Sequence, residues 1–143
     1  MRVLSEIKKE KEESKKQRIA KEKIYQKLKE IDVILRVKPM NSFEKVYISL
    51  AIQKIIEELA INYSLGKVEY KDENDIFEID IINPQLTTTD LKNILYREKQ
   101  NHRIYSLFQA LKEMDDFQVT NNPAGSGILI KVFKKINKDK ELS

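Results

Sequence analysis

The sequence predicts an α+β fold with a protruding N-terminal helix, a buried second helix, a β-hairpin, a pair of short helices and a C-terminal β-hairpin. Three patterns support this prediction. Apolar residues recur three or four positions apart over 24–35 and 48–59, which is the period of a helix. They alternate with polar residues over 76–82 and 128–132, which is the period of a strand. Proline, glycine and capping residues separate these segments.

Composition sets the broad class of the protein. The 143 residues are 41% hydrophobic and 35% charged, which suits one domain with a real core. No apolar run approaches the ~20 residues that span a bilayer, and the lysine-rich start lacks the apolar core of a signal peptide. We therefore expect a cytoplasmic protein with no membrane partner. The absence of cysteine excludes disulfides, thiol catalysis and thiolate zinc sites.

Charge is distributed unevenly along the chain. Residues 1–38 carry 13 basic and 7 acidic side chains, residues 39–86 carry 4 and 9, and residues 127–143 carry 5 and 2. The basic ends can reflect binding to a polyanion, or attraction between parts of the chain or its copies. We expect a basic helical arm over 1–38, an α+β domain over 39–136 and a flexible tail over 137–143.

The arm has two different halves. Lys8 to Arg18 contains no large apolar residue, so a helix there would be solvated and is expected to fray or to be ordered by a partner. The second half carries an apolar stripe that should be buried against the next helix, or used for a protein partner or self-association: Ile24, Leu28, Ile31 and Leu35. Pro39 ends this helix.

The second helix is expected to begin at Asn41-Ser42-Phe43-Glu44, a cap followed by glutamate, and to stop at Gly66. Its main stripe repeats the spacing of the first: Ile48, Ile52, Ile55 and Leu59. Further apolar residues widen the surface that is available for packing: Val46, Tyr47, Leu50, Ile56 and Tyr63. This pattern predicts the most buried helix of the protein, paired antiparallel with the first and covering the sheet.

A hairpin is expected over 67–82, with a turn at Asp72-Glu73-Asn74-Asp75. Phe77, Ile79 and Ile81 share one face of its second strand, and Glu78 and Asp80 share the other. The two carboxylates and the acidic turn suggest a metal-binding cluster, although a solvated strand face explains them more simply.

The stretch from Thr87 to Lys135 combines two short helices with a second hairpin. Thr87 to Asp90 forms a helix start, and the apolar pattern breaks between Tyr96 and Arg103 before it resumes at Ile104. Alternating residues around 117–119 and 128–132 then flank Asn122 to Gly127, which has turn composition.

This order of elements resembles the winged helix-turn-helix family over residues 87–135, with the helix-turn-helix-like pair followed by a hairpin as the wing. The resemblance implies a recognition helix and wing that contact double-stranded DNA through nine residues: Asn101, His102, Arg103, Ser106, Gln109, Lys112, Lys131, Lys134 and Lys135. Nearby acids depart from that pattern: Glu98, Glu113, Asp115 and Asp116. The same residues also fit the solvated face of an amphipathic helix. A single sheet formed by both hairpins would weaken the resemblance.

The sequence contains no combination of residues that is typical of a catalytic site. His102 is the only histidine, and Gly125-Ser126-Gly127 lacks the residues of a phosphate or dinucleotide loop. We expect no cofactor, no metal and no enzymatic activity. The leading hypothesis is a DNA-binding or regulatory protein, and the alternative is a protein-interaction module, such as an adaptor, inhibitor or assembly factor, that acts through the helical arm.

Overall fold

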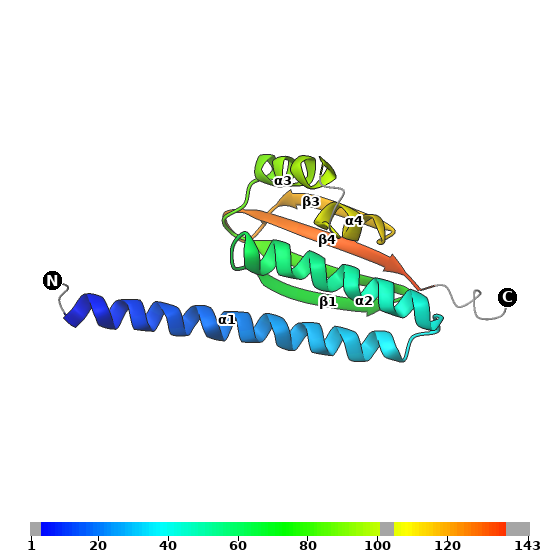
Figure 1. Cartoon of the computed structure of the whole chain (residues 1–143), viewed down its shortest axis with the longest axis horizontal. Helices are drawn as coiled ribbons and strands as arrows, with labels where there is room; N and C mark the ends of the chain where they lie inside the picture. Colours follow the sequence, from blue (N-terminus) through cyan, green and yellow to red (C-terminus); the bar gives the residue numbers. More distant parts are fainter. Residues whose placement is uncertain (1–3, 101–104, 137–143) are drawn as a thin grey trace.

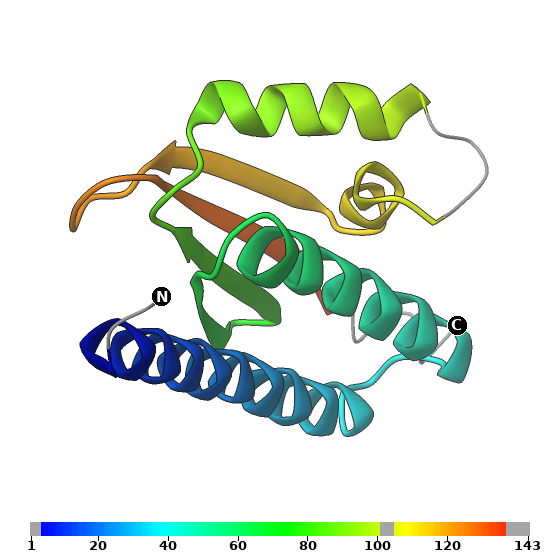
Figure 2. The same ribbon diagram turned by 60° about the vertical axis from the view of Figure 1, so that its left-hand side comes forward.

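The computed structural model describes residues 4–100 and 105–136, and it confirms the α+β fold. One four-stranded antiparallel sheet, in the order β1-β2-β4-β3, is covered on one face by helices (Figure 1). Helix α1 lies along β1 and α2 lies over the middle of the sheet. The shorter helices α4 and α3 follow toward β3 (Figure 2). The opposite face of the sheet carries no helix among the described residues.

Helix α1 spans Leu4–Arg36, and its two halves differ as the sequence suggests. Ile24, Ile31 and Leu35 are buried, while Leu28 is half-buried against the same core. The helix nevertheless continues back to Leu4, where fraying was expected. A helix that is already anchored adds residues without a new nucleation cost, and lysine and glutamate favour helix.

Polar contacts fix the second half of α1 between α2 and the edge strand β1. The Tyr70 hydroxyl donates to the Glu30 carboxylate at 3.2 Å, and Lys27 Nζ lies 3.3 Å from the Glu69 carboxylate. On the other side of α1, the Ser49 hydroxyl donates to Asp32 at 2.7 Å. The first half extends past the sheet (Figure 1).

Helix α2 spans Ser42–Glu57 and begins as expected, because the Asn41 side chain accepts the Glu44 N–H at 2.8 Å. It then changes into a π-helical turn, η1, at Glu58–Asn62 rather than continuing unchanged toward Gly66. The expected stripe is buried: Ile48, Ile52, Ile55 and Leu59. Of the five residues expected to widen this surface, Ile56 is buried and Tyr63 is exposed beyond the end of α2. Val46, Tyr47 and Leu50 are also exposed, since the sheet and the neighbouring helices occupy only one side of α2.

The two hairpins form one sheet. Strand β1 (Lys67–Glu73) pairs with β2 (Ile76–Asn83), and β3 (Asp116–Asn121) pairs with β4 (Ile128–Lys135). Strand β4 also pairs with β2, with Ile79 opposite Val132. The second hairpin is therefore part of the sheet on both sides of β4 and does not project as a separate wing. At its tip Gly127 has φ +91°, a conformation that suits glycine.

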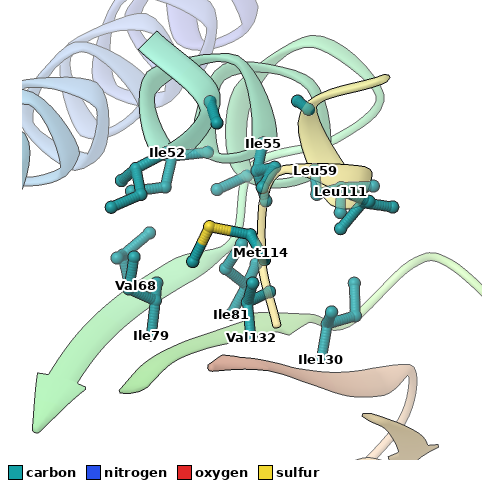
Figure 3. Packing of buried hydrophobic residues seen from close by; sticks show 14 of the residues in the cluster. Ile52, Ile55, Leu59, Val68, Ile79, Ile81, Leu111, Met114, Ile130 and Val132 are labelled. Atoms are coloured by element: carbon teal, nitrogen blue, oxygen red, sulfur yellow. The ribbon is translucent and has the colours of Figure 1, made fainter. Parts of the chain in front are cut away.

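Two helices connect the hairpins, as the interrupted pattern predicts. Helix α3 spans Thr88–Gln100 and begins with a reciprocal cap, in which Thr87 and Asp90 each bond the other's backbone N–H. Helix α4 spans Leu107–Lys112 and has Ser106 as its cap. The core lies between these two helices, α1, α2 and the sheet. Figure 3 shows Ile52, Ile55 and Leu59 facing Ile79, Ile81 and Val132, with Met114 between the layers.

Candidate functional site

The residues expected to read DNA lie partly inside the fold. Ser106 was expected to be exposed, but it is only 3% exposed, so this prediction is wrong. Its hydroxyl accepts the Gln109 N–H at 3.2 Å, and the Gln109 side chain accepts the Ser106 N–H at 2.9 Å. This reciprocal cap uses both side chains to begin a helix of six residues. Asn101, His102 and Arg103 lie outside the described residues.

Lys112, like Gln109, is exposed. Its Nζ lies 4.6 Å from the centre of the Phe108 ring, and Lys99 Nζ lies 5.8 Å from the same ring on the α3 side. These residues, with Gln109 and Ser106, line a surface pocket of about 320 Å³ between α3 and α4. Two ammonium groups lie beside one aromatic ring, and Glu98 lines the same pocket, so the surface is partly basic with an apolar centre.

The three lysines of the C-terminal hairpin do not share one surface. Lys131 lies on the helix-free face, with its Nζ 3.9 Å from Glu78. Lys134 lies on the helix side, where its Nζ donates to the Glu113 carbonyl at 3.1 Å and lies 3.6 Å from Asp115. The Lys135 N–H donates to the Asp115 carboxylate. Carboxylates thus already neutralise part of the charge that the resemblance assigns to phosphate contact.

Glu78 and Asp80 form a carboxylate pair on the helix-free face. Glu78 Oε2 and Asp80 Oδ1 are buried and accept no hydrogen bond. Burial, a hydrogen bond to Glu78 and the negative charge of Glu78 together raise the pKa of Asp80 to about 6, against the opposing charges of Lys131 and Lys71. The acidic turn does not complete a metal site, because no group of three or more metal-ligating side chains forms within the described residues.

A surface that the sequence interpretation missed lies on α2. Phe43, Val46, Tyr47 and Leu50 are all more than half exposed. Their spacing of three, four and seven places them along one side of the helix, directly opposite the buried stripe. We call these four residues the α2 stripe. The sequence shows three of these residues, Val46, Tyr47 and Leu50, as apolar, but it predicts that they pack in the protein, because a broad apolar helix is usually buried. Phe43 is seen in the sequence only as part of the helix start.

The α2 stripe borders a pocket of about 290 Å³. Apolar groups of Met40, Tyr47 and Ile48 form one side of the pocket, and polar groups from the end of α4 and from β4 form the other, including Glu113 and Lys134. Tyr47 belongs to both the stripe and the pocket. The exposed apolar surface of α2 is therefore continuous with a recess that has polar groups at its edge.

None of the described helices is long and apolar enough to cross a membrane. Comparison of the chain with protein-family models, with curated proteins and with solved structures finds no match.

Proposed function

We propose that the protein is a non-enzymatic protein-interaction module that binds through the outward side of α2. The observation that supports this proposal is the α2 stripe. A surface helix of a single domain normally has a polar outer side, and here the outer side is apolar over two turns. Contiguous exposed apolar surface of this kind is typical of protein–protein contacts.

The free energy of burying apolar side chains favours coverage of the α2 stripe by a partner. Full burial of a large apolar side chain is worth about 1.5–3 kcal/mol relative to exposure, and each stripe residue is still more than half exposed. A partner that covers Phe43, Tyr47 and Leu50 would gain much of this free energy. The two aromatic residues also fit the composition of interface centres, which are enriched in tyrosine and phenylalanine.

The arm supplies a second contact region for the same function. The first half of α1 extends past the sheet (Figure 1), and its side chains at 12 and 14–19 are exposed. Its apolar second half is not available to a partner, because Ile24, Ile31 and Leu35 are buried within the chain's own core. The sequence hypothesis of self-association through that stripe is therefore replaced by contact through α2.

Site-specific photo-cross-linking tests the proposal. A photoreactive residue in place of Leu50 should give a covalent adduct with a polypeptide in cells of the source organism. The matched control places the same group at Tyr96, which is exposed on α3. Val46→Glu should remove the Leu50 adduct while leaving the melting temperature nearly unchanged, because the site is exposed. Equal adduct yields at Leu50 and Tyr96 would overturn the proposal.

Duplex DNA binding is a second candidate function. Lys99 and Lys112 beside Phe108, with the exposed Gln109, provide the observation that favours it. Phosphate contacts should make binding salt-dependent, with ~0.9 decades of affinity lost per contact for each decade of salt. In a gel-shift titration at two salt concentrations, Lys112→Glu should weaken binding, whereas Lys67→Glu at the far sheet edge should not. DNA binding that is unchanged both by the salt concentration and by Lys112→Glu would contradict this candidate function.

A further inference from the structure

We infer that the α2 stripe pairs with the α2 stripe of a second copy of this chain, as two antiparallel helices related by a two-fold axis. The inference rests on the proposed function and names its partner. Most symmetric assemblies of soluble proteins are two-fold dimers, in which the same surface of each copy meets itself. The shape and charge of the α2 stripe suit such a surface, and the stripe supplies the apolar centre of the required area.

The shape of the stripe is self-complementary. In the antiparallel register that centres the axis between Val46 and Tyr47, Phe43 lies against Leu50 of the second copy. The two Val46 side chains meet on one side of the axis and the two Tyr47 side chains meet on the other. The large and small side chains are thereby distributed so that the helices can approach along the full stripe.

The charges are compatible with the same arrangement. The four stripe residues are uncharged, so two stripes meet without like-charge repulsion even though the chain carries a net +4. The antiparallel arrangement also keeps the two α2 N-termini, which are the positive ends of the helix dipoles, apart. Lys54, which lies just beyond the N-terminus of the second copy in this register, is already paired with Glu58 at 3.1 Å. A parallel pair would instead bring the two positive ends together.

The area is suitable when the stripe forms the interface centre. The four side chains are 51–77% exposed and present roughly 400 Å² of apolar surface, given that one fully exposed aromatic side chain contributes 150–250 Å². A stable dimer buries about 800 Å² per partner, with an apolar centre and a polar rim. Ser42, Gln53 and Glu57 adjoin the stripe and can supply that rim.

Engineered cysteines test the dimer directly, because the native chain contains none. Val46→Cys should form a disulfide-linked dimer under mild oxidation at least about tenfold faster than Val33→Cys, because associated thiols react at a millimolar effective concentration. Val33 is a matched control, since it is a 60% exposed valine on α1. The register predicts that Phe43→Cys mixed with Leu50→Cys forms the mixed dimer faster than either variant links to itself.

Three results together support the inference: this cross-linking pattern, a mass near twice 16.9 kDa in light scattering, and loss of both in Val46→Glu with the melting temperature kept. A monomer at all concentrations with no cross-linking above the Val33→Cys control overturns it. If the Leu50 photo-adduct contains only a different polypeptide, the dimer is overturned and the proposed function stands. If Leu50 gives no adduct above Tyr96, both fail.

Discussion

The Asn83 side-chain amide donates to the Leu59 carbonyl at 2.8 Å, which ties the end of β2 to the π-helical turn η1. Its Nδ2 also reaches the Ser64 carbonyl, and its Oδ1 accepts from the backbone N–H groups of Gln85 and Leu86. The side chain is fully buried. One amide therefore satisfies backbone groups that the irregular helix end and the turn after β2 would leave unpaired.

Asn83→Ala should destabilise the fold by about 3 kcal/mol or more, because it leaves the buried Leu59 carbonyl and Leu86 N–H, and the part-buried Gln85 N–H, without this partner. Asn83→Asp should also be destabilising, since it keeps the acceptor and loses the donor to Leu59. Asn93→Ala, at an exposed position of α3, should change stability by less than about 0.5 kcal/mol. Urea unfolding of the three variants measures these differences. A neutral Asn83→Ala would show that water replaces the amide.

The local parts of this fold are readable from sequence, and the long-range parts are not. The caps at Asn41 and Thr87 and the first hairpin follow from side-chain chemistry within four residues, and the structure confirms them. The turn expected at 72–75 is shorter than predicted, because residues 72 and 73 pair within β1 and only Asn74 and Asp75 form the turn. The pairing of Ile79 with Val132 joins strands more than 50 positions apart, and local periodicity contains no information about it.

The candidate site illustrates the same limit. Two apolar stripes on one helix predict burial of both, and only the arrangement of α1, α4 and the sheet shows that Val46 and Leu50 are left uncovered. The burial of Ser106 could likewise not be predicted from the sequence, because Ser-x-x-Gln occurs both as a helix-capping pattern and on polar helix surfaces. The DNA-contact prediction for Lys112 stays a prediction.

The Glu78 and Asp80 pair should make stability depend on pH. The pKa of Asp80 is raised from 3.8 to about 6, so the folded state holds a proton that the unfolded chain has already released. This contribution is present near pH 4 and is lost as the pH rises through about 6. Asp80→Asn should therefore raise stability at pH 7.5, while the advantage should disappear near pH 4.

The expected gain for Asp80→Asn is about 1 kcal/mol, less than the ~3 kcal/mol of two full pKa units, because the site is partly exposed and solvent screens it. Lys131→Met should act in the opposite direction at pH 7.5, since Lys131 lowers the pKa of Asp80. Thermal melts of both variants from pH 4 to 8 measure these effects. If the melting temperatures of Asp80→Asn and the native chain changed in parallel with pH, the proton held by Asp80 would not contribute to the pH dependence of stability.

The packing of α1 on the rest of the protein should depend on its own buried apolar residues. Ile31 is 1% exposed, so Ile31→Ala should cost about 2–5 kcal/mol. Leu28 is only half-buried, and Leu28→Ala should cost less than Ile31→Ala. Val33→Ala, on the outer side of the same helix, is the control and should be close to neutral. Denaturant unfolding of the three variants gives this order, and a Val33→Ala cost equal to that of Ile31→Ala would contradict it.

Removal of residues 1–18 should leave stability almost unchanged, within about 0.5 kcal/mol. The buried contacts of α1 begin at Ile24, and the ion pair and hydrogen bond to β1 involve Lys27 and Glu30. The described side chains before Ile19 are exposed and can contribute only weak pairs along the helix. Far-ultraviolet circular dichroism should show less helix, while the melting temperature should stay the same.

The truncated chain also separates the roles of the arm and the α2 stripe. The disulfide cross-link at Val46→Cys should persist without residues 1–18, because the stripe lies on α2 and the deletion does not touch it. A lower Leu50 photo-adduct yield would then assign a binding contribution to the arm. If the melting temperature falls by several degrees after truncation, the charged segment packs on the domain, and its role as an exposed contact region has to be abandoned.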